Sequence, residues 1–234
     1  MPRGDAALRP AAFFDVDGTL AKTTIVDYYV FFRRRKMSPL GGKLWLAAYL
    51  VKCLYFIAVD RVNRSKFNEI FYRSYRGLSS AEIKALADAC YRTVFRPRRF
   101  PQALACIEEH RRANHEIVLV TGSIDFLIQP LADELGIADL LAPSLLESQG
   151  RFTGELDSRP MSDGEKARRV RDFAAAAGID LAHSHAYGDS VTDVAMLEAV
   201  GFPHAVNPDR GLARTARARG WSVHRWTLDG DHPG

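Results

Sequence analysis

Two aspartates separated by one residue, Asp15 and Asp17, end the first apolar run of the chain, AAFFDVD, and Gly18 and Thr19 follow them. Paired carboxylates attract a divalent cation, and Mg²⁺ prefers one or two carboxylates together with water and substrate phosphate. A carboxylate can also act as a nucleophile that forms an aspartyl-phosphate. Because a phosphate dianion repels a carboxylate, this reaction needs a metal ion and a lysine to neutralise charge. Taken alone, the same pair is also typical of a turn at a strand end.

Three further polar clusters follow along the chain. Thr121, Gly122 and Ser123 stand between an apolar run and the start of a helix, where hydroxyls and backbone N–H groups can bind a phosphate oxygen. Lys166 begins a basic helical segment. Asp189 and Asp193 lie four residues apart in GDSVTD. Each cluster is a weak signal, but the ordered set predicts a site for phosphate and a metal ion.

The elements that must position these residues are strands alternating with helices. Apolar runs at 11–17, 116–121, 185–188 and 203–206 predict strands, and segments 124–135, 191–200 and 211–219 predict helices after the last three. Such alternation favours a parallel α/β sheet with helices on both faces. The polar clusters fall at the carboxyl ends of the strands, where sheets of this class bind ligands.

With the motifs FFDVDGTL, VLVTGS, DGEK and YGDSVTD in this order, the sequence resembles the haloacid dehalogenase superfamily of phosphohydrolases. The match covers residues 11–22 and roughly 113–208, and it implies a Rossmann-like core. It also implies that Asp15 is the nucleophile, and that Asp17 is the general acid that later activates water. An aspartate at position 17 favours a phosphatase, since an ester leaving group needs a proton.

The same resemblance implies a set of binding residues. Mg²⁺ would be held by the Asp15 carboxylate, the Asp17 backbone carbonyl and Asp189, with Asp193 in support. Thr121 and Gly122 would hold the phosphate, to which we add Ser123. Lys166 would bind phosphate and offset charge in the transition state. Phosphoserine phosphatases of this superfamily typically carry a glutamate that reads the substrate ammonium group where this chain has Thr24, and an asparagine where it has Thr192. This difference argues against free phosphoserine and leaves another small phosphorylated metabolite as the expected substrate.

Residues 23–112 differ in character from the rest of the chain. They look almost wholly helical and hold 18 Lys and Arg against 7 Asp and Glu, a net charge of +11, whereas the remainder carries −7. The segment resembles the helical C1-type cap of the phosphoserine-phosphatase-like branch, subfamily IB. We therefore predict a catalytic core at 1–22 and 113–234 and a cap at 23–112. Ser79 is expected to cap a helix, residues 102–113 to form another, and residues 147–156 to form a hairpin with Gly150 and Gly154 at turns.

The charge of the cap does not identify the molecule that it contacts. Arg61, Arg64, Arg73 and Arg76 are candidate substrate readers, although exposed arginines are commonly only solvated. The run Leu44–Val59 is expected to be a helix buried within its own domain. Because its flanks are basic, the alternative is contact with an anionic membrane surface, which would make the chain a phosphatase of a lipid phosphate. A third alternative is a phosphate-binding module without turnover. Nucleic acid is not expected, because no recognisable module accompanies the charge.

The cysteine pattern bears on the compartment. Cys53, Cys90 and Cys106 form no CxxC or metal-binding spacing, and no secretory signal is recognisable. We therefore expect a cytoplasmic location, with peripheral membrane contact as the alternative. The oligomeric state is not predicted.

Overall fold

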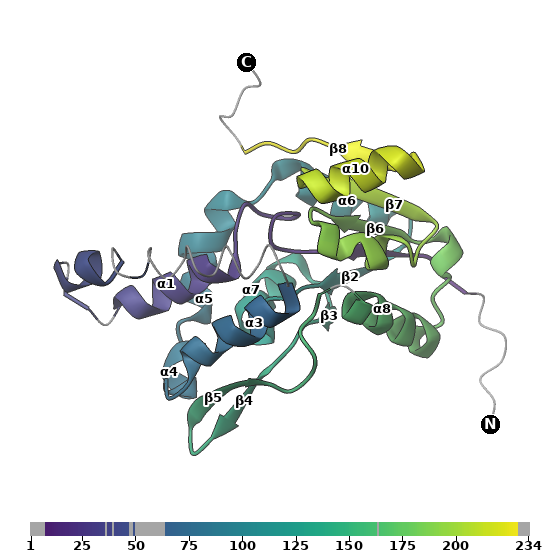
Figure 1. Ribbon diagram of the computed structural model, residues 1–234. Helices are drawn as coiled ribbons and strands as arrows, with labels where there is room; N and C mark the ends of the chain where they lie inside the picture. The colour runs from purple at the N-terminus through teal and green to yellow at the C-terminus, as the bar shows by residue number, and fades with distance from the viewer. Residues whose placement is uncertain are drawn as a thin grey trace, which may run out of the picture.

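The computed structural model describes residues 8–35, 37, 38, 40–46, 49, 64–162 and 164–228. Its centre is a six-stranded sheet in the order β3-β2-β1-β6-β7-β8, in which every neighbouring pair is parallel (Figure 1). The strands are β1 (Ala11–Phe14), β2 (Glu116–Val120), β3 (Asp139–Leu141), β6 (His185–Gly188), β7 (Phe202–Val206) and β8 (Ser222–His224). The predicted parallel α/β fold is therefore confirmed. Sequence reasoning missed β3 and β8, three-residue strands at the two edges.

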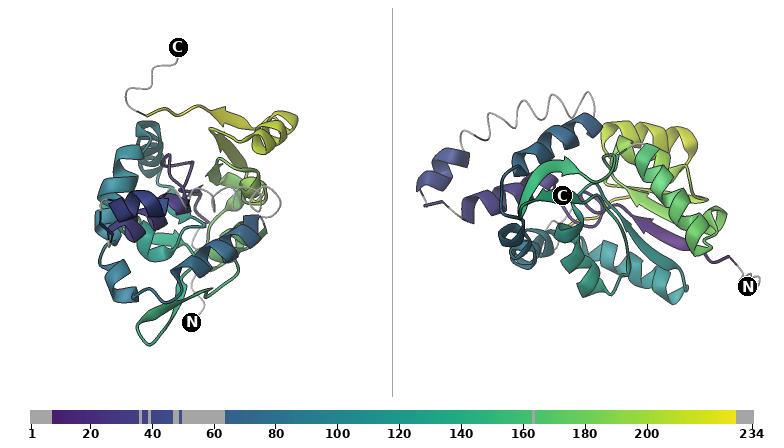
Figure 2. Two further views of the ribbon diagram at one scale, coloured as in Figure 1. Left: turned by 60° about the vertical axis from the view of Figure 1, so that its left-hand side comes forward. Right: turned by 90° about the horizontal axis from the view of Figure 1, so that it is seen from below.

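Helices cover both faces of this sheet. Side chains that alternate along a strand point to opposite faces, so Phe13 and Phe14 of β1 lie in different apolar clusters. Phe13 belongs with α8 (Gly164–Ala177), α9 (Val194–Leu197) and α10 (Arg210–Arg219), and Phe14 with α6 (Pro101–Arg112) and α7 (Asp125–Leu135). The right-hand view of Figure 2 shows the sheet between these two layers. The predicted helix at 191–200 is shorter, since a 3₁₀ turn, η5 (Val191–Asp193), precedes α9.

The inserted segment extends from the carboxyl end of β1 and is largely helical (Figure 1). It contains α1 (Ile25–Arg35), α3 (Arg64–Tyr72), α4 (Ser80–Lys84), α5 (Ala87–Cys90) and the short turns η1 (Arg73–Tyr75), η2 (Tyr91–Phe95) and η3 (Arg96–Arg98). Ser79 caps α4, as expected, by accepting a hydrogen bond from the Glu82 backbone. Residues 40–46 are also helical, while most of the run Leu44–Val59 lies outside the described residues. Within the described part of the chain, no helix is long and apolar enough to cross a bilayer.

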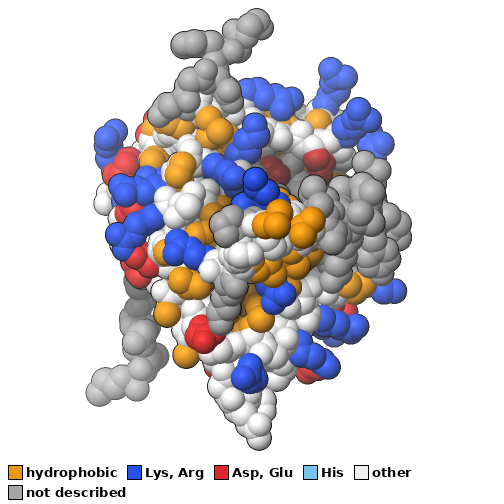
Figure 3. Space-filling view, turned by 90° about the vertical axis from the view of Figure 1, so that its left-hand side faces the viewer, with side chains coloured by type: hydrophobic (Ala, Val, Ile, Leu, Met, Phe, Trp, Pro, Cys, Tyr) orange, Lys and Arg blue, Asp and Glu red, His pale blue; other side chains and the backbone are white. Residues whose placement is uncertain are grey.

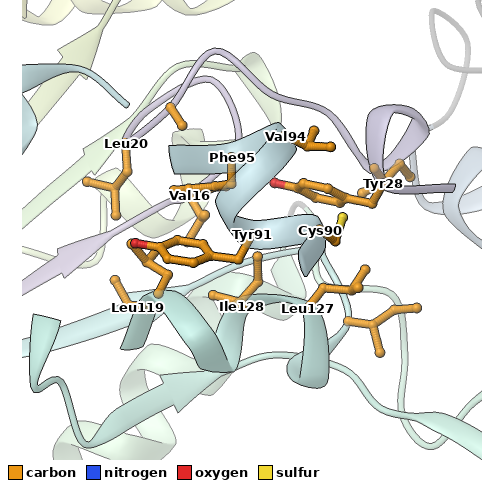
Figure 4. Close-up of a cluster of buried hydrophobic side chains, with 14 of the residues drawn as sticks. Val16, Leu20, Tyr28, Cys90, Tyr91, Val94, Phe95, Leu119, Leu127 and Ile128 are labelled. Atoms are coloured by element: carbon orange, nitrogen blue, oxygen red, sulfur yellow. The ribbon is translucent and has the colours of Figure 1, made fainter. Parts of the chain in front are cut away.

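The insertion is joined to the core by apolar packing. Figure 4 shows Tyr91 and Cys90 of the insertion above Leu127 and Ile128 of α7. Tyr28 of α1 lies in the same cluster, and all five side chains are buried. The helix α6, which we placed at the end of the cap, contacts β2. The cap boundary at residue 112 stays a prediction. The contact of α6 with the sheet favours a boundary before Pro101, with α6 belonging to the core.

The predicted hairpin is confirmed as β4 (Leu145–Ser148) and β5 (Arg151–Leu156), which pair antiparallel. Gly150 is in the turn, but the prediction of a turn at Gly154 is wrong, because this glycine lies within β5. Its φ is +78°, and a Cβ atom there would lie 2.9 Å from the Arg73 Cα atom. A glycine therefore allows the hairpin to approach η1 of the insertion.

Candidate active site

The predicted site residues line one cavity of about 420 Å³ at the carboxyl ends of β1, β2 and β6. The strands that follow β1 lie first on one side of it, as β2 and β3, and then on the other, as β6, β7 and β8. The carboxyl end of β1 is therefore the topological switch point of the sheet. All eight predicted residues contribute to the lining: Asp15, Asp17, Thr121, Gly122, Ser123, Lys166, Asp189 and Asp193.

A buried ion-pair network forms the floor of the cavity. Lys166, in the first turn of α8, places its Nζ atom 2.5 Å from Asp15 Oδ1 and 2.6 Å from Asp193 Oδ1. Thr19 donates a hydrogen bond to the other Asp15 oxygen at 3.2 Å. Lys166, Asp15 and Asp193 are 4%, 5% and 1% exposed. Charges at this depth persist only when they are paired, so each member depends on the others.

Burial and mutual charge shift the pKa values of this network. Burial raises the pKa of the Asp15 carboxyl, Lys166 opposes this shift, and the negative charge of Asp193 adds to it. Burial alone would lower the pKa of Lys166, but the two carboxylates outweigh burial and raise it. Lys166 is therefore a permanent cation beside a carboxylate that is reluctant to ionise without further positive charge.

Hydroxyl groups orient Asp17. Its Oδ1 atom accepts hydrogen bonds from Thr23 Oγ1 at 2.7 Å and from Tyr28 Oη at 2.6 Å. Its Oδ2 atom lies 2.5 Å from Ser123 Oγ. A hydroxyl can donate or accept, so these contacts can persist whether or not Asp17 carries a proton. Ser123 thus contacts the second aspartate as well as lining the predicted phosphate position.

The loop after β2 is held from two sides. The Ser123 backbone N–H donates to Thr121 Oγ1 at 3.0 Å, and Tyr72 of α3 donates to the Gly122 carbonyl at 2.7 Å. A Cβ atom on residue 122 would lie 3.3 Å from the Met161 carbonyl oxygen. Only a small residue fits there without displacing that backbone.

A group of three carboxylates could hold a metal ion. Asp15, Asp189 and Asp193 each offer one oxygen, and these oxygens lie within 4.8 Å of one another. Gly18 has a φ of +89°, and a Cβ atom there would lie 2.5 Å from Asp189 Cγ, so glycine leaves room for that carboxylate. Oxygen donors of this kind fit Mg²⁺. The Asp17 carboxylate lies outside this group, and the metal-binding role of its backbone carbonyl stays a prediction.

The two oxygens of Asp193 already have partners in the protein. Oδ1 pairs with Lys166, and Oδ2 accepts from the Ser190 backbone N–H at 3.1 Å, which completes a capping box at η5. Gly188 allows this close approach, since a Cβ atom there would lie 2.7 Å from Asp193 Cβ. These contacts suit a residue that positions Lys166 beside the metal site.

The insertion supplies residues that sequence reasoning did not select. Thr23 and Asn68 line the cavity, as does Lys22 directly before the insertion, and Tyr28 reaches Asp17 through the contact described above. Asn68 is 4% exposed, although it comes from α3, about fifty residues from either flanking motif. A polar residue between the apolar residues Phe67 and Ile70 was the one available signal.

Among the positions that bear on specificity, Thr24 also lines the cavity. It precedes α1 and donates to Asp27 Oδ2 through both its backbone N–H and its hydroxyl at 2.8 Å, so the Asp27 carboxylate holds it at the start of that helix. The predicted readers Arg73 and Arg76 do not line this cavity; Arg76 donates to the Thr153 carbonyl in β5. Arg61 and the side chain of Arg64 lie outside the described residues.

Known proteins resemble this chain over most of its length. A protein of Streptomyces azureus named as an inhibition of morphological differentiation protein is 34% identical over 217 residues, which cover 92% of this chain and 78% of that protein. A probable phosphatase of Mycobacterium tuberculosis is 30% identical over 217 residues, with 92% and 75% covered.

Solved structures share the fold. A crystal structure of a protein of unknown function from Bordetella pertussis has a TM-score of 0.78 at 29% identity, over 93% of this chain and 99% of that one. A substrate-bound phosphoserine phosphatase has a TM-score of 0.70 at 16% identity, over 94% of both chains, and shows the fold alone. The model of the family described as haloacid dehalogenase-like hydrolase matches residues 12–198. The chain therefore belongs to the haloacid dehalogenase-like hydrolase family, with the fold of the phosphoserine phosphatases, as its four motifs predicted.

Proposed function

We propose that this phosphatase, a phosphoric monoester hydrolase, acts on a small phosphorylated metabolite with Mg²⁺ and through a phosphoryl group carried by Asp15. The observation that supports this most is the placement of the Asp15 carboxylate. It lies at the floor of the cavity beside Lys166, within a group of carboxylates that suits a metal ion, and next to a second aspartate held by hydroxyls.

The charges of the site favour a divalent cation. Asp15 and Asp193 share the ammonium group of Lys166, and an oxygen of Asp189 lies within 4.8 Å of theirs, so three carboxylates gather at this place. Asp15 and Asp189 are the carboxylates we expect to hold Mg²⁺, with the Asp17 backbone carbonyl. When bound, Mg²⁺ supplies positive charge that favours the ionised form of Asp15 and offsets the charge of the substrate phosphate.

In the first step, an Asp15 oxygen forms a bond to phosphorus while the bond from phosphorus to the ester oxygen breaks. Asp17 gives its proton to the departing oxygen, and Ser123 and Tyr28 hold it in position. Lys166 keeps positive charge beside the nucleophile throughout.

In the second step, Asp17 takes a proton from water, and the water oxygen bonds to phosphorus as the bond to Asp15 breaks. Phosphate leaves, and both carboxyl groups return to their first state. The proposed roles of Thr121, Gly122 and Ser123 are to hold the phosphate oxygens during both steps, with hydroxyl and backbone N–H donors at the start of α7.

The test of this mechanism combines turnover with chemical trapping. Asp15→Asn should abolish hydrolysis of p-nitrophenyl phosphate in Mg²⁺ and leave no acid-stable phosphoprotein, while Asp17→Asn should slow the release of phosphate. Asp172→Asn is a matched control, because that residue is exposed on α8, far from the proposed chemistry. Wild-type turnover in Asp15→Asn, with an unchanged circular dichroism spectrum, would show that another group accepts the phosphoryl.

The substrate can be identified by comparing the rates at which the enzyme hydrolyses different phosphorylated metabolites. The Thr24 hydroxyl donates to the Asp27 carboxylate, and this side chain carries no charge with which to bind an ammonium group. We therefore expect slow hydrolysis of phosphoserine relative to other metabolites in a panel that includes histidinol phosphate, sugar phosphates and lysophosphatidic acid. Rapid and selective hydrolysis of phosphoserine would contradict this expectation.

A second candidate is a phosphatase of a lipid phosphate at a membrane surface. Leu40 and Leu44, beside Lys43, are 69% and 65% exposed. Figure 3, which faces the cap end of the molecule, shows hydrophobic side chains among Lys and Arg. Sedimentation with vesicles that contain anionic lipid tests this candidate, and absence of binding at low salt would remove it. The cytoplasmic location stays a prediction.

A further inference from the structure

Five histidines lie in one connected group on the face of the sheet that α6 covers. His110 Nδ1 is 2.8 Å from His115 Nδ1, His185 Nδ1 is 3.0 Å from His204 Nε2, and His204 Nδ1 is 3.0 Å from His224 Nε2. The rings of His110 and His185 pack with centroids 4.6 Å apart. None of these residues lines the catalytic cavity. The proposed phosphatase chemistry does not use them.

The end of α6 brings His110 and His115 together. Ala113 ends this helix, Asn114 has a left-handed φ of +58°, and the chain then turns back. The His115 backbone N–H donates to the His110 carbonyl, and that of Asn114 donates to the Arg111 carbonyl. These two bonds form a Schellman motif, in which the residues at its two ends come into side-chain contact. Here that contact is between two imidazoles.

The register of the sheet brings the third histidine to the same place. β1 lies between β2 and β6, and its residue Ala12 pairs with Ile117 on one side and with His185 on the other. The small side chain of Ala12 leaves space above the central strand. His110 and His115 can therefore reach across β1 to His185, with the His115 and His185 rings 5.3 Å apart.

We propose that His110, His115 and His185 bind one divalent transition metal ion of the zinc class, each through one imidazole nitrogen. One nitrogen from each residue lies within 4.8 Å of the others. Imidazole suits zinc and its neighbours in the first transition row, whereas Mg²⁺ prefers oxygen, so this ion differs from the one expected at Asp15. Three protein nitrogens leave a fourth tetrahedral position for water.

The contact between His110 and His115 requires little rearrangement to hold an ion. Two nitrogens bound to zinc at 2.0–2.1 Å in a tetrahedral arrangement lie about 3.3 Å apart. The His110 and His115 nitrogens would separate by roughly 0.5 Å from their present contact, in which they share one proton. His115 and His185 are only half-buried, so an ion can reach them from solvent.

The surroundings favour neutral, oriented imidazoles, which is the form that binds metal. Burial lowers the pKa of His110 to about 4 and also lowers that of His185. The other nitrogen of His110 contacts the Tyr187 hydroxyl at 2.9 Å, and Nδ1 of His185 contacts His204, which leaves its Nε2 atom available. Such outer contacts orient metal-binding histidines.

The site is remote from the proposed chemistry. His185 begins β6 and Asp189 follows the end of that strand, which places them about 13 Å apart at 3.3 Å per residue. The ion would join the end of α6 to β6 and stabilise the fold without contacting the substrate.

The test measures zinc on the full chain with excess Mg²⁺ present throughout. After exposure to Zn²⁺ and dialysis against Mg²⁺ buffer, the wild-type chain should retain one zinc ion per molecule. His115→Gln and His185→Gln should weaken zinc binding at least tenfold, since even the loss of a residue that only orients a metal ligand typically costs about 10–100-fold in affinity. His183→Gln is the matched control, because this histidine is 74% exposed and pairs with Asp180 outside the cluster. It should bind zinc as the wild type does.

Two further measurements separate this site from the candidate active site. Asp189→Asn should retain the zinc, whereas zinc bound among the carboxylates would be lost in that variant. X-ray absorption at the zinc edge of the wild-type protein should show imidazole nitrogens and does not depend on any variant folding. No retained zinc, retention in both histidine variants, or an all-oxygen environment would each overturn the proposal.

Discussion

Replacement of Lys166 by methionine is expected to be among the most damaging changes in the core. The substitution keeps the length and most of the apolar volume of the side chain but removes its charge. In the metal-free protein it leaves Asp15 and Asp193 buried with no cation between them, since both make their short contact with Lys166. The expected result is a large loss of stability together with loss of phosphatase activity.

The size of this effect follows from burial. Removing one partner of a buried ion pair costs about 3–5 kcal/mol, because an uncompensated charge stays behind. For a chain of this length, each kcal/mol lowers the unfolding midpoint by about 2–4 °C, so the fall should be about 6–20 °C. The loss should be smaller at pH 5 than at pH 8, because the pKa of Asp15 is already raised by burial and the carboxyl can accept a proton.

Thermal unfolding in chelator-treated buffer, followed by circular dichroism, measures this loss. Asp193→Asn in the Lys166→Met background should restore part of the stability, because it removes one of the unpaired charges. Arg168→Met on the same helix is the control and should change little, since Arg168 is 56% exposed and its partner Glu165 keeps a second ion pair with Arg169. A fall of less than about 3 °C in Lys166→Met, or no recovery in the double variant, would refute the reasoning about an unpaired buried charge.

Three other changes test the site. Gly18→Ala should weaken Mg²⁺ binding, because a Cβ atom would displace Asp189, and should lower the free energy of unfolding by about 1–3 kcal/mol, because the φ at this position is +89°. Calorimetric titration with Mg²⁺ measures the affinity, and an unchanged affinity would contradict this prediction. The pKa of Asp15 is raised in the folded state, so its contribution to stability is present below the unfolded pKa and is lost as pH rises through the folded one. Metal-free protein should therefore lose stability from pH 5 to pH 8, and Asp15→Asn should lose less over the same range. Ser123→Ala removes a contact to Asp17 and should lower kcat and shift its pH profile, whereas a change in KM alone would place Ser123 only at the substrate.

The core of the site could be predicted because its signals are local. Asp15, Thr121 and Asp189 each follow a short apolar run, and a parallel sheet brings the carboxyl ends of adjacent strands to one edge. Once the strands are recognised, topology places these residues together without any knowledge of side-chain packing. Lys166 is different, because only its order among the other motifs distinguished it from a solvated surface lysine.

The parts that could not be predicted depend on tertiary contacts. Tyr28 looks like one aromatic residue among many in a helical segment, yet its hydroxyl reaches Asp17. His110 and His115 showed no metal-ligand spacing along the chain, because a Schellman turn and the register of β6 bring them to His185. Gly154 was expected at a turn, since a lone glycine does not reveal whether it serves a turn or a close approach of two backbones.

The insertion also takes part directly in the catalytic geometry. Tyr28 of α1 bonds Asp17 at 2.6 Å, and Tyr72 of α3 bonds the Gly122 carbonyl at 2.7 Å, so two helices of the insertion contact the proposed acid and the proposed phosphate loop. If these helices moved away to admit a substrate, both hydrogen bonds would break, and Asp17 would lose one of the hydroxyls that orient it. Closure over a substrate that fits would restore them. We therefore expect a movement of the insertion to affect the orientation of the proposed acid through Tyr28 and that of the proposed phosphate loop through Tyr72.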